Sequence, residues 1–272
     1  MTSMTTPPGR VGWMALTGAH IRRDWFTAWS YRLPFVAGLF TSIASLLLYF
    51  FIAKLVDRAQ FDDTPELANG YFGFVVVGSS LVSIMSVGIS VSAARLTRAQ
   101  STGTLEAMAV TPVPLWATTF LGTMYDLLYA TASGIVTMAA AVVFFGVRLD
   151  VATEAIALIV AAIIATFMLF ASVGLLVSAF GLVFKRTGPL LTLVNTGLTF
   201  LGGVFFPVDV LPGPVRIVAE AMPFTWAIDV LRLSLLAGAV PVGRLIALVL
   251  SALAVFPLSG LVVSYAVNRT RK

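Results

Sequence analysis

The residues of this sequence that could perform chemistry are a few polar groups inside long apolar stretches. Asp126, in FLGTMYDLLYA, is the clearest, because it lies about 11 residues, or roughly 16 Å of helix, after an apolar stretch begins at Leu115. A carboxylate at such a depth in a bilayer is costly unless it faces water or a partner. Asp126 is therefore a candidate pathway residue, and a later start of the stretch would instead place it near the membrane interface.

Asn195, in TLVNTGLTF, is a second polar residue within an apolar stretch. Its amide could line a pathway or form a hydrogen bond between helices, and the structural role is favoured. Small residues such as Gly134 and Gly174 are expected to permit close packing of helices.

Catalytic motifs are absent from the sequence. It contains no HExxH, no GxSxG and no run of Asp residues that could hold Mg²⁺ over a phosphate. With no Cys and one His, thiolate chemistry and a His/Cys zinc site are excluded. The segment GLVFKRTG has the wrong residue order for a Walker A motif. We therefore expect no enzymatic activity, metal site or bound cofactor, and if ATP drives this protein, another chain must bind it.

The composition is typical of a membrane protein. The chain of 272 residues is 59% hydrophobic and 11% charged, and its mean hydropathy is +0.99. One soluble core could not hide so much apolar surface. The net charge of +5 does not indicate nucleic-acid binding, because the basic residues gather in short loops and tails, as membrane topology requires.

Six apolar stretches are long enough to cross a bilayer as helices, which predicts an all-α membrane protein forming one domain over residues 1–272. The predicted spans are 33–53, 71–94, 115–145, 152–184, 189–206 and 243–267. One side of this arrangement receives 11 of the 17 Lys and Arg residues, among them Arg95, Arg98 and Lys272. The positive-inside rule then predicts a cell-membrane protein whose N- and C-termini both lie in the cytoplasm.

Two further segments are expected to lie at the membrane surface. Residues 11–31 place Val11, Met14, Ile21, Trp25 and Trp29 on one helical face, which predicts an interfacial helix after a cytoplasmic tail, the alternative being a soluble tail. Residues 207–240 are cut into short pieces by prolines and are too apolar for a solvated loop, so they predict two re-entrant helices, the alternative being an amphipathic surface loop. The residues that we assign to this outer segment are Phe206, Pro207, Pro223, Trp226, Asp229 and Arg232, and the last two have the spacing of a helical pair.

The stretch STGTLEAMAVTPVPLW, within the predicted cytoplasmic loop 95–114, has the features of a short docking helix. Thr104 can act as N-cap, Glu106 lies in the first turn, and Pro112 biases Thr111 out of the helix. Leu105 and Met108 share one face, and so short a helix is marginal alone. It therefore predicts insertion into a groove of a partner, whereas a purely structural turn would need neither cap nor apolar face.

The sequence resembles the ABC-2 type permease family, the membrane subunits of bacterial ATP-binding-cassette exporters, and is closest in style to daunorubicin-resistance permeases. GTLEAMAVTPVPLW resembles the family's loop after its second span, and FFPVDVLPGPVRIVAEAMPFTWAIDVLR its outer segment before the last span. The resemblance implies a coupling helix that docks into a separate ATPase, which binds ATP and Mg²⁺. It also implies a second permease copy, identical or related. The coupling positions it assigns are Gly103, Thr104, Leu105, Glu106, Met108, Thr111 and Pro112.

The resemblance further implies outward transport of a substrate between two permeases, surrounded by membrane lipids. A lipophilic or amphipathic substrate is favoured, with a polysaccharide or lipid-linked glycan as the alternative. From other classes, a membrane-embedded transferase and a channel-like or scaffold protein also remain open.

Overall fold

The computed structural model describes residues 17–18, 21–23, 26, 32–55, 70–104, 114–151, 155–184 and 188–270. Every regular element in these ranges is a helix, in agreement with the predicted all-α fold. The helices are α2 (Arg32–Leu55), α3 (Gly70–Ser101), α5 (Leu115–Phe145), α6 (Ala155–Phe184), α7 (Gly188–Leu201), η3 (Val208–Val210), α8 (Gly213–Glu220), α9 (Pro223–Leu236) and α10 (Val242–Thr270).

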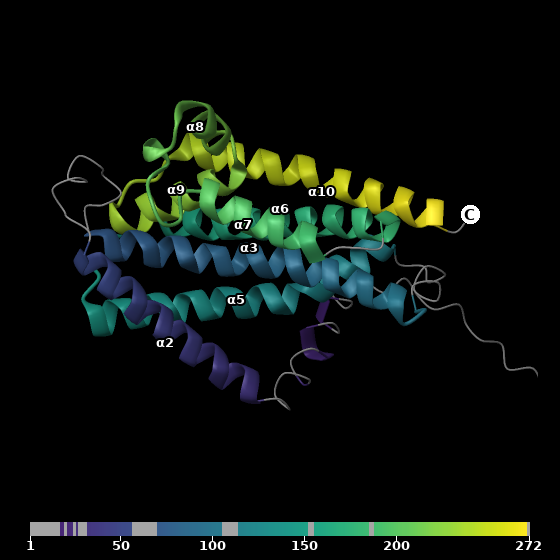
Figure 1. Cartoon of the computed structure of the whole chain (residues 1–272), viewed down its shortest axis with the longest axis horizontal. Coiled ribbons are helices and arrows are strands. Elements are labelled where there is room, and N and C mark those ends of the chain that lie inside the picture. Colours follow the sequence, from purple (N-terminus) through teal and green to yellow (C-terminus); the bar gives the residue numbers. More distant parts are fainter. Residues whose placement is uncertain are drawn as a thin grey trace, which may run out of the picture.

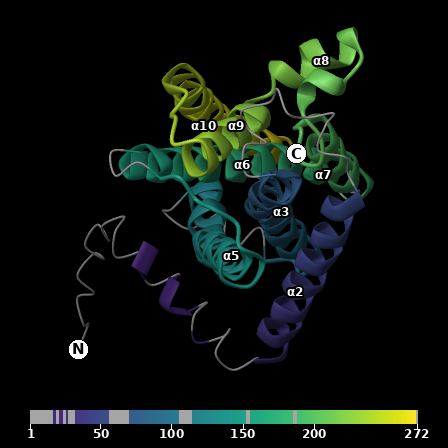
Figure 2. The same cartoon turned by 90° about the vertical axis from the view of Figure 1, so that its left-hand side faces the viewer.

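The long helices form a bundle around α3. Figure 1 shows α3, α5, α6 and α10 lying along the long axis of the molecule, whereas α2 diverges from them toward its N-terminus. The view along the bundle in Figure 2 places α3 between α5, α6 and α2. The end of α3, the start of α5 and the end of α10 all lie at the end of the molecule that carries the C-terminus (Figure 1).

Close packing of α3 against α6 depends on glycine. A Cβ on Gly174 would lie 2.5 Å from the carbonyl oxygen of Gly88 and 2.8 Å from that of Ile89, so only glycine fits. This confirms the predicted packing role of Gly174. Gly134 differs, because a Cβ there would meet the Ser80 Cβ at an ordinary 3.5 Å.

Four helices of the described chain are long and apolar enough to cross a membrane: Gly70–Ser101, Leu115–Phe145, Ala155–Gly181 and Val242–Ala266. Shorter apolar stretches, Phe40–Leu55 and Gly188–Leu201, lie in α2 and α7. These six helices stand where the six spans were predicted. The fifth span is predicted over 189–206, whereas the helix α7 stops at Leu201. Its 14 residues reach about 21 Å, short of the roughly 30 Å hydrocarbon layer.

A tight turn explains the early end of α7. Gly202 and Gly203 follow Leu201, and Gly203 has a positive φ of +72° that other residues rarely adopt. A Cβ on Gly202 would lie 2.3 Å from the ring of Phe224, so the turn also presses against α9. The sequence stays hydrophobic through Phe205 and Phe206, so hydropathy cannot reveal where α7 ends.

Residues 207–240, predicted as the outer re-entrant segment, contain two short helices, α8 and α9, with opposite surroundings. Most residues of α8 are exposed, including Ile217 and Val218. In contrast, α9 is packed into the bundle, with Phe224 and Ile228 fully buried. Thus α8 has the character of an amphipathic surface element, and α9 belongs to the core.

The predicted interfacial helix at 11–31 lies largely outside the described residues, including Val11, Met14, Trp25 and Trp29. The parts that are described, Thr17–Gly18, Ile21–Arg23 and Phe26, are helical. The Arg22 guanidinium lies over the Phe26 ring, 5.6 Å from its centroid, as residues four apart on a helix can.

Candidate functional site

The antiparallel helices α3 and α5 carry the predicted coupling stretch between them (Figure 1). Leu105, Glu106, Met108, Thr111 and Pro112 lie outside the described residues. Two of the predicted coupling residues, Gly103 and Thr104, are described. Gly103 takes the left-handed conformation with φ +68°, which ends α3.

Thr104 closes the last turn of α3. Its hydroxyl donates to the carbonyl of Ala99 over 3.3 Å and lies 3.0 Å from the hydroxyl of Thr102. Thr102 in turn donates to the carbonyl of Arg98 at 2.9 Å. These bonds satisfy carbonyls that the end of a helix leaves without partners. The chain therefore leaves α3 by a hydrogen-bonded turn, from which the coupling stretch starts.

An ion pair joins α3 to α5 near this end. A terminal guanidinium nitrogen of Arg95 donates to Asp126 Oδ2 at 2.8 Å, and the two side chains are 31% and 33% exposed. Because α5 begins at Leu115, Asp126 does lie 11 residues into its helix. The carboxylate therefore has a cationic partner, as a charge inside an apolar helix requires.

Small and polar residues beside this pair bring the two helices together. A Cβ on Gly122 would lie 3.1 Å from a terminal nitrogen of Arg95, so the absence of a side chain at Gly122 makes room for the guanidinium. One turn further into α3, the buried hydroxyls of Ser92 and Thr123 lie 3.2 Å apart. Together these contacts fix α3 and α5 to each other at the end that carries the coupling stretch.

Asn195 forms the interhelical hydrogen bond that the sequence favoured. Its Nδ2 donates to Ser90 Oγ at 3.2 Å, which ties the short α7 to α3. This contact lies on the opposite side of α3 from the ion pair with α5 (Figure 2). The structure therefore does not bring Asn195 and Asp126 into one site.

Arg232 is the most deeply buried charge among the described residues, 1% exposed in the middle of α9. Its three guanidinium nitrogens donate to the carbonyls of Phe74, Gly203 and Val204 at 2.8 to 3.1 Å. Its cation also lies 3.4 Å from the centroid of the Phe74 ring. Arg232 thus fastens α9 to α3 and to the turn after α7.

The other residues assigned to the predicted outer segment make contacts that hold neighbouring helices together. Asp229, on the same buried face of α9 as Arg232, accepts from Arg244 of α10. The Trp226 indole donates to the carbonyl of Glu220 at 2.7 Å, which fixes the angle between α8 and α9. Pro223 opens α9, Pro207 precedes η3, and Phe206 is half-buried between α7 and η3.

These features define the class of the protein: a multi-pass helical membrane protein whose second and third long helices present a connecting stretch at one end of the bundle. The model of the ABC-2 type transporter family matches residues 14–236. The chain belongs to this family, so it is the membrane subunit of an ABC transporter, a permease rather than a catalyst, and partners with an ABC ATPase. Among curated proteins, no sequence matched this chain.

Proposed function

We propose that this chain is the permease subunit of an exporter in the cell membrane, which moves a lipophilic or amphipathic substrate outward. ATP and Mg²⁺ would be bound by a separate ATPase subunit, and two permease copies, identical or related, would form the pathway. In this proposal all six apolar helices reach across the bilayer, with both termini in the cytoplasm. The short α7 would then cross the bilayer together with the residues that follow the turn at Gly203.

The observation that carries this proposal is the bracing of α3 against α5 beside the coupling stretch. The Arg95–Asp126 ion pair and the Ser92–Thr123 contact join the two helices in the half of each helix that is nearer that stretch. A displacement of a docked coupling helix would then move both helices as one body instead of bending the connection. ATP binding by the partner could in this way be transmitted to the substrate pathway.

Transport in inside-out membrane vesicles tests the proposal. Vesicles would contain this chain with a candidate ABC ATPase from the same genome, and daunorubicin and a fluorescent lipid analogue would serve as probes. We expect ATP-dependent uptake of at least one probe, which is lost with a Walker A variant of the ATPase. Uptake without ATP would contradict the exporter assignment and favour a channel.

The alternatives give different results in the same system. Export of a polysaccharide or lipid-linked glycan predicts no uptake of either probe but ATP-dependent translocation of a labelled glycolipid. A membrane-embedded transferase predicts turnover of a lipid donor by the purified chain without any ATPase.

A further inference from the structure

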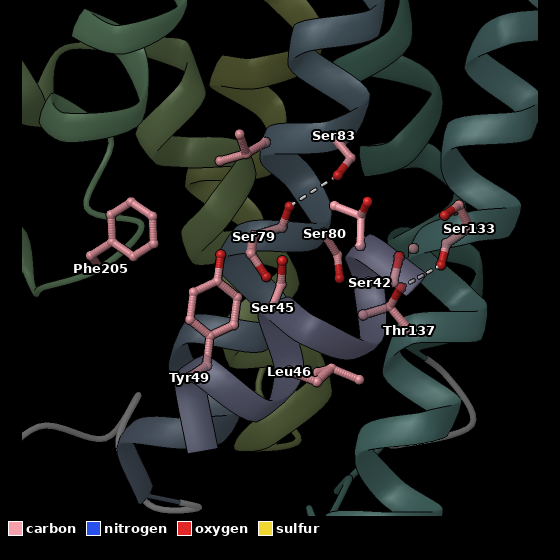
Figure 3. Close-up of a pocket in the computed structure, with 13 residues that line it drawn as sticks. Ser42, Ser45, Leu46, Tyr49, Ser79, Ser80, Ser83, Ser133, Thr137 and Phe205 are labelled. Carbon is pink, nitrogen blue, oxygen red and sulfur yellow. Dashed lines mark hydrogen bonds between the residues drawn. The ribbon is translucent and has the colours of Figure 1, made fainter. Parts of the chain in front are cut away.

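A cavity of about 210 Å³ lies between α2, α3 and α5, with Phe205 at its edge (Figure 3). Nine of its 13 lining residues carry a hydroxyl group, and none of the 13 carries a charge. The Ser45, Ser79 and Tyr49 hydroxyls turn toward the same space in Figure 3. So many hydroxyls around one cavity, in helices this apolar, call for an explanation.

Five of these hydroxyls donate to carbonyls of their own helix, at 2.8 to 3.4 Å. They are Thr41, Ser79, Ser80, Ser83 and Thr137. Such bonds use the proton of each hydroxyl and leave its oxygen able to accept. Ser79 is also hydrogen-bonded to the Tyr49 hydroxyl of α2. The wall of the cavity therefore offers several hydrogen-bond acceptors at fixed positions.

Three other hydroxyls, those of Ser42, Ser45 and Ser133, form no hydrogen bond with the residues that the structure describes. Each can donate as well as accept. Hydroxyls that only join helices look different in this molecule, since Ser92 and Thr123 are fully buried and lie against each other. Ser42, Ser45 and Ser133 instead line the cavity without such a partner, so helix packing alone does not explain them.

The cavity lies at membrane depth. Ser79 is nine residues, about 14 Å, from the start of α3. On α2 the lining residues Thr41, Ser45 and Tyr49 share one helical face, and the opposite face exposes Phe40, with 72% of its surface, and Leu47. The hydroxyl groups of α2 are therefore turned toward α3 and α5, and its outward face is apolar.

We propose that this cavity binds the uncharged, hydroxyl-bearing or amide-bearing head of the transported molecule, while the apolar remainder lies in the surrounding hydrocarbon layer. The inference rests on the proposed export function and specifies its substrate as a neutral amphiphile. A volume of about 210 Å³ is below the roughly 300–1,000 Å³ of drug-sized sites, so it fits a glycerol unit or one polar ring. A charged head would lose its hydration without gaining a counter-ion.

Photolabelling of the full chain in lipid nanodiscs tests this site without needing ATP. The probe is monoolein with a diazirine on its glycerol, and the competitors share one acyl chain: unlabelled monoolein, oleate and oleylamine. We expect labelled peptides from α2, α3 and α5, and competition by monoolein at concentrations about tenfold lower than by either charged amphiphile. Equal competition by all three, or labelling confined to other helices, would overturn the proposal.

Substitutions within the cavity sharpen the test. Gly134→Leu should fill the cavity, because a Cβ at Gly134 has only an ordinary 3.5 Å contact with Ser80. We expect it, and the double variant Ser45→Ala with Ser79→Ala, to lower labelling about tenfold. The matched control is Thr192→Ala, which removes an exposed hydroxyl from α7 that bonds only its own helix. Unchanged labelling in Gly134→Leu would overturn the assignment even if the serine variant fails to fold.

A transport measurement distinguishes a transported substrate from a lipid that only resides in the cavity. In vesicles that contain the ATPase, ATP-dependent movement of the monoolein probe should be lost in Gly134→Leu and kept in Thr192→Ala. If the probe binds in nanodiscs but its movement is unaffected by Gly134→Leu, the cavity holds a bilayer lipid and the substrate claim is wrong. Failure of export itself, with selective binding intact, would instead count against the proposed function.

Discussion

Arg95 of α3 and Asp126 of α5 are ion-paired at 2.8 Å, and Asp126 is the one acidic residue in the 31 residues of its helix. We predict that Asp126→Asn lowers the free energy of unfolding by about 1–2 kcal/mol, between the values for exposed and buried pairs, because Arg95 loses its counter-charge. Thermal unfolding in detergent would show a lower melting temperature. Asp150→Asn, which removes an exposed carboxylate at the other end of the bundle, is the control.

The charge-swapped double variant distinguishes bracing from a role in the pathway. Arg95→Asp combined with Asp126→Arg should recover most of the lost stability. If it also recovers transport, Asp126 acts through its partner. Transport equal to wild type in both Asp126→Asn and Asp126→Leu would contradict any functional role of this carboxylate.

Arg232→Met should be among the most destabilising single changes in this chain. It removes three hydrogen bonds to buried carbonyls, of which those of Gly203 and Val204 lie outside the helices, and we expect a loss of about 3–5 kcal/mol. Arg232→Lys should lose less but remain unstable, since one ammonium group cannot reproduce the spacing of the guanidinium donors. The measurement is the yield of monodisperse protein and its melting temperature.

Arg216→Met supplies the matched comparison for Arg232. Arg216 forms ion pairs with Asp209 at 2.5 Å and Glu220 at 2.6 Å, and its pKa is raised, mainly by the hydrogen bond to Glu220. It is nevertheless on the surface, where such pairs contribute little. A loss of stability in Arg216→Met as large as in Arg232→Met would refute the importance of burial.

Gly174→Ala should separate α6 from α3. The added methyl group would lie 2.5 Å from the Gly88 carbonyl oxygen, and the expected cost is about 1–3 kcal/mol. Gly197→Ala, inside α7 with open space around it, should be neutral or stabilising by up to about 1 kcal/mol. Melting temperatures of the two variants, compared with wild type, check the prediction, and a similar fall in both would show that the packing argument is wrong.

Hydropathy and helix signals in the sequence located the long helices to within a few residues except at the end of α3, which continues seven residues beyond the predicted 94, because long apolar runs and prolines are local features. The end of α7 was missed because it depends on Gly203 adopting a positive φ against α9. The partner of Asp126 was also missed. Arg95 was counted as a loop residue by its place after an apolar run, and only the length of α3 puts it beside α5.

The hydroxyl cavity could have been suspected but not assembled from the sequence. GSSLVS at 78–83 and TSIAS at 41–45 are visible clusters of hydroxyl residues. Whether they face lipid, another helix or a common space depends on how α2 diverges from α3, which no local pattern records. The contacts of Arg232 could not be predicted from the sequence either, since its three acceptors come from segments at least 28 residues away along the chain.

Docking of the coupling stretch into an ABC ATPase is the central claim, and co-purification tests it most directly. The tagged chain would be isolated in mild detergent from membranes of cells that also produce a candidate ABC ATPase from the same genome. The coupling variants are Leu105→Asp and Glu106→Arg, and the control is Leu149→Asp, the same change at an exposed position at the opposite end of the bundle. Correct insertion of each variant is checked by its melting temperature.

We predict that wild type and Leu149→Asp retain the ATPase in equal amounts with the permease and show ATP-dependent transport. Leu105→Asp and Glu106→Arg should lose both while remaining folded and inserted. Retention of the ATPase and of ATP-driven transport by folded Leu105→Asp and Glu106→Arg would contradict the coupling role of this stretch.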